Sequence, residues 1–204
     1  MFAVIEGIEG SGKSTLQVGV AEALRALGHR VTTTREPGGS PLGDAIRALF
    51  LAPELEVDPV AEAMLVNAAR VQHLAALIRP ALERGETVIC DRFVDSTLAY
   101  QGYGRGLDLA MLRGLCEIAV GGLVADVTIL LDCEPKLSRH RLDERGSARD
   151  RLENENAGFH GRVREGFLAL ARGSERHVVL DAADSREALV AAALAAIEGA
   201  SAHG

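Results

Sequence analysis

Five short segments, most of them apolar, are bounded by turn residues, which is the pattern of buried strands. They cover residues 2–5, 30–34, 86–90, 127–131 and 177–180. Between them, apolar side chains recur three or four residues apart, as expected for helices that bury one face. Strands that alternate with helices predict an α/β fold with a five-stranded parallel sheet and helices on both faces.

The helices can be placed by their periodicity and by the residues at their ends. Leu16, Val20, Leu24 and Leu27 recur after the first strand, and Gly28 ends that helix. Further helices are predicted at residues 41–51, 58–78, 94–100, 108–120, 134–141, 159–170 and 189–197.

Three stretches should interrupt this regular pattern. Pro80 should kink or end the long helix that begins at Asp58, because proline cannot donate the helical hydrogen bond. Residues 102–106 are rich in glycine and are predicted to form a loop. Residues 143–155 are almost wholly charged or polar, so we expect them to stay outside the core.

The first strand runs into Gly7-Ile8-Glu9-Gly10-Ser11-Gly12-Lys13-Ser14, which fits the phosphate-loop pattern G-x-x-x-x-G-K-[ST] between a strand and a helix. In this setting, backbone N–H groups surround an anion and the helix N-terminus adds partial positive charge. Lys13 reaches the outer phosphates, and the Ser14 hydroxyl can hold magnesium. The predicted ATP-binding residues are Gly7, Ile8, Glu9, Gly10, Ser11, Gly12, Lys13, Ser14 and Thr15.

Chemically reactive residues follow three of the predicted strands. The phosphate loop, residues 35–37 and the pair Asp91-Arg92 each stand where a strand ends. Ligands of open parallel sheets bind outside the carboxyl ends of the strands. We therefore expect these three segments to face one crevice.

Length and charge limit the classes of function. The 204 residues suit one domain, and a net charge of -7 argues against a broad nucleic-acid or anionic-membrane surface. The apolar runs are too short to span a bilayer, and no charged leader precedes the first strand, so we expect a cytoplasmic protein. Cys90, Cys116 and Cys133 lie in apolar stretches and are interpreted as buried free thiols.

The residues resemble bacterial thymidylate kinases over nearly the whole chain. The resemblance rests on the phosphate loop and on TREPGGSPLGDAIR, NAARVQH, DRFVDSTLAYQGYGRG and DRLE, at residues 34–47, 67–73, 91–106 and 150–153. It implies a single P-loop kinase domain over residues 1–204, with a mobile lid at about 143–155. It also implies phosphoryl transfer from magnesium ATP to dTMP, and a homodimer.

A phosphate acceptor needs charge neutralisation more than a strong base, and arginine supplies it best. By resemblance, Arg92 and Arg70 grip the dTMP phosphate, with Arg47 and Arg35 as weaker candidates. Tyr100 lies under the deoxyribose. The predicted dTMP-binding residues are Glu9, Arg35, Arg47, Val66, Arg70, Arg92, Thr97, Tyr100 and Gln101.

The resemblance also implies a metal site and a catalytic lid. Asp91 matches the carboxylate that holds magnesium through water, beside Ser14, and Glu153 assists there. Glu9 meets the acceptor 3'-hydroxyl or a magnesium-bound water. The lid carries Arg145, Arg149 and Arg151, of which Arg149 or Arg151 is predicted to act in catalysis with Lys13 and Arg92, and the choice between those two stays open.

Val66 departs from the family pattern. Four residues before Arg70, on the same helical face, the family carries an aromatic side chain that stacks on thymine. Valine offers no stacking face, so Phe93 or Tyr103 could compensate, or the acceptor could be another nucleoside monophosphate. A nucleotide-dependent switch is a further alternative, but neither lysine lies in the N-K-x-D motif that specifies guanine in switch GTPases.

Overall fold

The computed structural model describes residues 1–146 and 148–201 of the chain. Its strands form a single five-stranded sheet in the order β2-β3-β1-β4-β5, and every neighbouring pair is parallel. The strands are β1 (Phe2–Glu6), β2 (Val31–Arg35), β3 (Thr87–Asp91), β4 (Val127–Asp132) and β5 (His177–Asp181). The predicted α/β class and parallel sheet are confirmed.

Helices fill the connections between the strands. The α-helices are α1 (Lys13–Ala26), α2 (Pro41–Leu51), α3 (Pro59–His73), α4 (Arg79–Glu83), α5 (Val94–Thr97), α6 (Leu109–Val120), α7 (Pro135–Arg145), α8 (Ala157–Arg172) and α9 (Arg186–Ser201). Two π-helical segments, η1 (Leu74–Ile78) and η2 (Leu98–Gly104), continue α3 and α5. None of the helices in the described ranges is long and apolar enough to cross a membrane.

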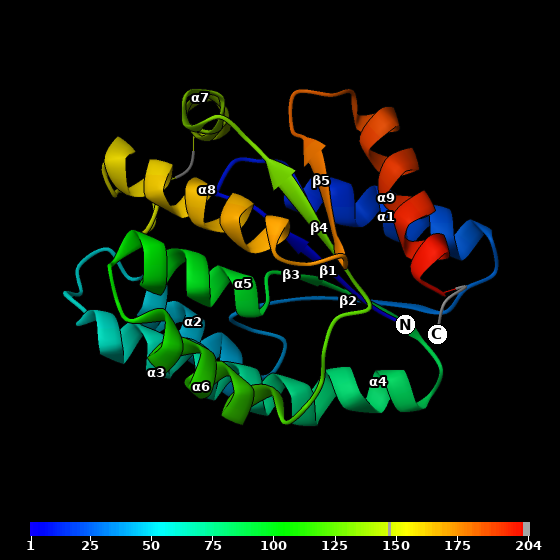
Figure 1. Cartoon of the computed structure of the whole chain (residues 1–204), viewed down its shortest axis with the longest axis horizontal. Coiled ribbons are helices and arrows are strands. Elements are labelled where there is room, and N and C mark those ends of the chain that lie inside the picture. Colours follow the sequence, from blue (N-terminus) through cyan, green and yellow to red (C-terminus); the bar gives the residue numbers. More distant parts are fainter. Residues whose placement is uncertain (147, 202–204) are drawn as a thin grey trace.

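Helices cover both faces of the sheet, so alternate strand residues enter different cores. Ala3 and Ile5 of β1 pack in a core with residues of α1, α8 and α9. Phe2 and Val4 pack on the other face with η1, α4 and the end of α6. Figure 1 shows α1 and α9 together on one side of the sheet and α4 and α6 on the other.

One sequence prediction about a helix boundary is wrong. Residues 102–104 belong to η2 rather than to a loop, and the reason is close packing. A Cβ at Gly102 would lie 2.5 Å from Leu109 Cδ2, and one at Gly104 would lie 2.7 Å from Phe159 Cε2. Because these glycines have no side chain, α6 and α8 can pack closely against a continuous helix.

Of the two outcomes predicted for Pro80, a kink or an end, the end does not occur, because the helix runs on through α4 to Glu83. The π-helical segment η1 immediately precedes the proline, and the Arg79 N–H bonds to the Leu74 carbonyl. A π-helical turn rearranges the carbonyls that would otherwise meet the proline ring.

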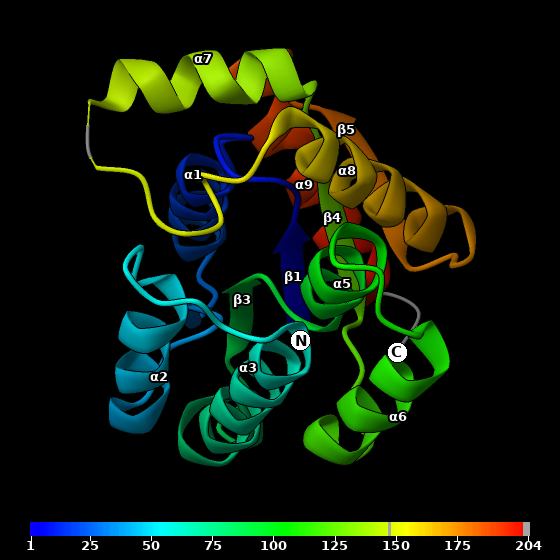
Figure 2. The same cartoon turned by 90° about the vertical axis from the view of Figure 1, so that its left-hand side faces the viewer.

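One residue of the predicted lid, residues 143–155, enters the core, contrary to expectation. Leu152 is 6% exposed and packs in the core that contains α1, and Glu153 is 5% exposed. The Arg151 N–H bonds to the Leu51 carbonyl at 3.1 Å, which ties this segment to the end of α2. In Figure 2 the yellow segment after α7 passes above α2 before it joins α8. Ser147 of the predicted lid lies outside the described residues.

Candidate active site

The phosphate loop needs glycine at the positions where the pattern has it. Gly7, Gly10 and Gly12 have positive φ angles of 143°, 69° and 101°, which side chains rarely adopt. A Cβ at Gly7 would lie 2.6 Å from the Leu131 carbonyl oxygen, and one at Gly10 would lie 2.7 Å from that of Ser138. The loop therefore packs closely between β4 and α7.

Lys13 opens helix α1 and folds over the loop. Its ammonium group donates to the Ile8 carbonyl at 2.8 Å. Burial, followed by the nearby Arg92 guanidinium, lowers the pKa of Lys13 to about 8. A desolvated cation at a helix N-terminus is suited to a phosphate ligand.

A cavity of about 190 Å³ adjoins the loop at the carboxyl ends of β1 and β3. Most of the predicted site residues line it. They are Glu9, Gly10, Lys13, Ser14, Arg47, Val66, Arg70, Asp91, Arg92, Thr97, Tyr100, Gln101 and Glu153. Glu36 and Pro37 line it as well, so the three strand-end segments do meet at one crevice.

Some predicted residues stand outside the lining. They are Gly7, Ile8, Ser11, Gly12 and Thr15 of the loop region, together with Arg35, Arg149 and Arg151, none of which is among the lining residues of the described chain. Arg35 is exposed at the end of β2. Arg47 lines the cavity and donates to the Pro37 carbonyl at 3.2 Å.

Arg92, Glu9 and Tyr100 form a tight polar group on the cavity wall. Arg92 donates to Glu9 Oε1 at 2.8 Å and to the Tyr100 hydroxyl at 3.3 Å, and Tyr100 donates to Glu9 Oε2. Burial works against the charge of Glu9, but Arg92 and then Lys13 outweigh it and lower the pKa of Glu9. Glu9 is therefore an ionised group held between two cations.

The backbone of Arg92 is strained. Its φ of 73° is the one positive φ of a non-glycine residue in the described ranges. Such a conformation costs on the order of 1–3 kcal/mol and is found mainly where the surroundings enforce it, often at functional sites. In this conformation the guanidinium donates to the Gly7 carbonyl at 3.0 Å.

Arg70 is bound on every side by protein groups. Its Nε donates to Glu36, one terminal nitrogen to Asn67 and Cys116, and the other to the Phe93 carbonyl and Thr97. These contacts use all five guanidinium N–H groups. Arg70 would have to release a partner to bind a phosphate directly, and its predicted phosphate contact stays a prediction.

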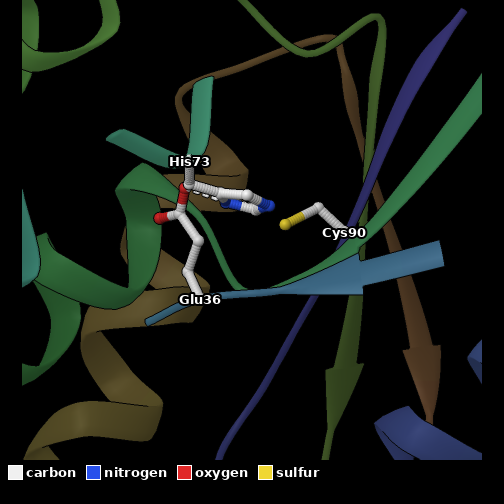
Figure 3. A group of neighbouring side chains, drawn as sticks. All are labelled: Glu36, His73 and Cys90. Atoms are coloured by element: carbon white, nitrogen blue, oxygen red, sulfur yellow. Dashed lines mark hydrogen bonds and ion pairs between the residues drawn. The ribbon is translucent and has the colours of Figure 1, made fainter. Parts of the chain in front are cut away.

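Glu36 of this network belongs to a group with metal-ligand chemistry. Glu36, His73 and Cys90 bring one potential ligand atom each within 4.8 Å of one another, from the end of β2, α3 and β3 (Figure 3). Both ring nitrogens of His73 are already engaged, Nδ1 with Glu36 at 3.2 Å and Nε2 with Thr34 at 2.7 Å. Glu36 also accepts from Arg70 Nε at 2.7 Å, so Glu36 and His73 form a hydrogen-bond network that supports Arg70, and the Cys90 thiol bonds elsewhere.

The cysteines follow the sequence interpretation. All three are buried free thiols. Cys90 donates to the Arg92 carbonyl at 3.1 Å, and burial raises the pKa of its thiol well above the ordinary value. A buried neutral thiol is a packing group rather than a nucleophile.

Asp91 and Ser14 fit a magnesium ion. The Ser14 hydroxyl lies 3.3 Å from Asp91 Oδ2. Asp91 Oδ1 is buried and has no hydrogen-bond partner among the described residues, so a carboxylate oxygen is left for a hard cation. Glu153, also predicted here, lines the cavity and accepts from Arg145 at 2.9 Å.

The lid arginines differ in whether they line the cavity or pair with residues outside it. Arg149 pairs with Asp143, and Arg151 binds the Phe50 carbonyl and the buried Glu62. Arg145 lines the cavity and contacts both oxygens of Glu153 at 2.9 Å. The lid arginine at the cavity is thus Arg145.

The aromatic side chains near the site differ in whether they line the cavity beside Val66. Val66 is 7% exposed and lines the cavity, as do Phe93 and Phe50. Tyr103 packs against Gly166 of α8 and is not among the lining residues in the described ranges, so it does not replace the missing ring. Phe93 already contacts Phe2 edge-on and lies under the Arg70 guanidinium.

Sequence reasoning missed several residues that complete the site. Ser96 lines the cavity, Ser138 donates to the Glu9 carbonyl at 2.7 Å, and Arg141 donates to the Ser11 carbonyl at 3.2 Å. Ser96 stands inside one of the quoted motifs, which was a usable signal. Ser138 and Arg141 carry no such signal, because only the packing of α7 places them at the loop.

Comparisons with known proteins agree with this geometry. The family model described as thymidylate kinase matches residues 5–193. The thymidylate kinase of Deinococcus radiodurans is 48% identical over 97% of this chain and 96% of its own length, and that of Clavibacter sepedonicus is 47% identical over 94% and 91%. The crystal structure of thymidylate kinase from Ehrlichia chaffeensis covers 97% of this chain and 98% of its own, with a TM-score of 0.78 and 31% identity. This chain belongs to the thymidylate kinase family.

Proposed function

We propose that this protein transfers the terminal phosphoryl group of ATP to dTMP, giving ADP and dTDP, in the cavity beside the phosphate loop. The observation that carries the proposal is that Lys13 and Arg92 line the same cavity from two different strand ends. One cation serves the donor phosphates and the other the acceptor phosphate. A kinase that joins two anions needs this arrangement, because the transition state spreads negative charge over the transferred group.

The donor half of the site comprises the loop, Lys13, Ser14 and Asp91. Magnesium bound there with ATP would neutralise phosphate charge, and Ser14 and Asp91 are the residues that would hold it. The backbone N–H groups of the loop orient the donor phosphates, while Lys13 brings a positive charge to the outer ones. Glu153 has a supporting place at the cavity through Arg145.

The acceptor half comprises Arg92, Arg47 and the Glu9–Tyr100 pair. Arg92 offers a fixed cation to the dTMP phosphate, and Arg47 stands beside it in the same cavity. Tyr100 and Glu9 present a hydrogen-bonding edge for the sugar. Val66, Thr97, Gln101 and Arg70 complete the wall, and Glu36 holds Arg70 in place.

A lid completes the site. Among its arginines, Arg145 is best placed to meet the transferred phosphoryl group, because it lines the cavity. Arg151 fastens the lid to Glu62 of α3, a carboxylate with no exposed surface. Both roles suit a segment that excludes water from the reaction.

Val66 keeps one alternative open, a preference for another deoxynucleoside monophosphate. A valine wall selects bases less sharply than an aromatic ring that stacks. Family membership sets the switch interpretation aside.

We further propose a cytoplasmic homodimer. Large apolar side chains are exposed on α3 and α6, including Met64 at 58%, Val71 at 50% and Ile118 at 81%. Exposed apolar residues of this size on neighbouring helices favour a protein partner. Light scattering that gives a monomer mass at micromolar concentration would reject the dimer.

Separate binding measurements test the two halves of the site. Lys13→Ala should weaken ATP binding and lower kcat by about 10²-fold or more, since it removes a charge aimed at the phosphates. Arg92→Ala should weaken dTMP binding and lower kcat similarly. Lys136→Ala and Arg172→Ala are matched controls, because both side chains are exposed. Near-normal turnover in Lys13→Ala or Arg92→Ala would refute the role given to that residue.

A further inference from the structure

Glu6 is a buried carboxylate beside the active site that the reaction described above does not use. It is the last residue of β1, immediately before the phosphate loop, and is 1% exposed. It is not among the residues that line the active-site cavity. Its oxygens accept from the Phe93 N–H at 2.7 Å, the Ser96 N–H at 3.2 Å and the Ser96 hydroxyl at 2.6 Å.

All three donors belong to residues 92–96, which we call the Arg92 segment. This segment begins with the strained backbone of Arg92 and continues into the first turn of α5. The first N–H groups of a helix have no helical acceptor, so a side-chain carboxylate can fix the start of the helix. Here that carboxylate comes from another strand, and it holds the segment directly after Arg92.

The side chain of Arg92 bonds this segment to the start of the phosphate loop. It donates to the Ser96 hydroxyl at 3.1 Å and to the carbonyl of Gly7, the residue that follows Glu6. Glu6, Ser96, Arg92 and Gly7 therefore form a closed ring of contacts. The ring joins the strand that carries the phosphate loop to the segment that carries the acceptor cation.

The electrostatics indicate that Glu6 contributes hydrogen-bond acceptors rather than charge. Burial, followed by repulsion from Asp95, raises the pKa of Glu6 to about 7, although Ser96, Arg92 and Phe93 act in the opposite direction. The surroundings therefore do not stabilise a negative charge strongly. A neutral group of the same shape should serve nearly as well.

We propose that Glu6 is a positioning residue that holds the Arg92 segment, and thereby aims the Arg92 guanidinium at the acceptor phosphate. The proposal rests on the function proposed above for Arg92. Glu6 touches neither substrate. It fixes the distance between the two halves of the site by bonding one half to the strand that carries the other.

Three substitutions at Glu6 test the proposal through steady-state kinetics. Glu6→Ala removes every acceptor and should lower kcat by about 10²-fold, because a displacement of about 1 Å can cost this much, while the ATP KM stays near normal. Glu6→Gln keeps an oxygen for the two N–H groups and should stay within about threefold of wild type. Glu6→Asp is too short to reach them and should resemble Glu6→Ala.

Asp126→Ala is the matched structural control. Asp126 accepts from the Phe2 N–H at 2.7 Å, so it also bonds a carboxylate to a backbone amide, but at the opposite end of β1. It should lower the melting temperature and leave kcat unchanged. A Glu6→Gln variant as inactive as Glu6→Ala would show that charge is required and would overturn the proposal. If Glu6→Ala does not fold, Glu6→Asp decides, and wild-type kcat in that variant would also overturn it.

A double-mutant cycle separates this proposal from the function proposed for Arg92. If Glu6 acts through Arg92, Glu6→Ala should cause little further loss of kcat in an Arg92→Ala background. Independent, multiplicative losses would refute the positioning role of Glu6. Normal activity of Arg92→Ala alone would instead refute the role given to Arg92, whatever Glu6 does.

Discussion

The buried carboxyl group of Glu6 predicts a specific dependence of stability on pH. Its pKa rises from 4.5 to about 7 on folding, through burial and then Asp95. Because the folded state binds this proton more tightly, the group stabilises the fold fully below pH 4.5 and loses that contribution as pH rises toward 7. At about 1.36 kcal/mol per pH unit, the loss is roughly 3 kcal/mol.

Glu6→Gln removes this titration and leaves a neutral side chain of similar shape. The free energy of unfolding of the variant minus that of wild type should therefore grow by roughly 3 kcal/mol between pH 4.5 and 7 and stay constant above. For a chain of this size, this corresponds to a relative rise in melting temperature of roughly 6–12 °C.

Urea or thermal unfolding of both proteins from pH 4.5 to 8 measures the difference, in which contributions shared by both proteins cancel. Glu22→Gln is the control, because it makes the same substitution at an exposed position on α1. A difference that does not change with pH, or a variant that loses stability relative to wild type above pH 7, would show that folding does not raise the pKa of Glu6.

Three further predictions concern the wall of the site, its support and its lid. Val66→Phe should tighten dTMP binding roughly fivefold, since base stacking on an aromatic ring contributes about 1 kcal/mol or more. Calorimetry measures the dissociation constant, with Val66→Leu as the control, and equal dTMP affinity in both variants and wild type would contradict the prediction. Gly39→Ala should lower stability by about 2–5 kcal/mol, because its φ is 72° and a Cβ would lie 2.3 Å from His73 Nε2; Gly28→Ala, with φ 90° and no atom within 4 Å, should lose less in thermal unfolding. Among the lid variants, Arg145→Ala should lower kcat the most, and a larger loss in Arg149→Ala or Arg151→Ala would return the catalytic role to those residues.

The order of the secondary structure could be predicted because each strand is a compact segment between turn residues and the helices carry clear periodicity. The wrong helix boundary came from glycine. Gly102 and Gly104 suggested a loop, but in the structure they create room for Leu109 and Phe159 on a continuous helix. Local sequence cannot distinguish a glycine that turns the chain from one that admits a neighbour, because the difference lies in tertiary packing.

The site was predictable where chemistry and local spacing coincide. The phosphate loop and Asp91-Arg92 stand at strand ends, so the parallel sheet alone brings them together. Glu6 lies between the predicted first strand and the phosphate loop and was given no role, because its contact with Ser96 spans 90 positions in the sequence. Among the lid arginines, the sequence favoured Arg149 or Arg151, whereas Arg145 is the one that lines the cavity, because the path of the lid decides which of them reaches it.

The most direct test of the central claim is a coupled ADP-release assay with ATP, magnesium and a panel of acceptors. The panel comprises dTMP, dUMP, dCMP, dGMP and AMP, each measured for kcat/KM. The two-anion site predicts turnover that depends on an acceptor and is highest with dTMP. A higher kcat/KM for any other acceptor, or ADP release that does not depend on an acceptor, would contradict the account.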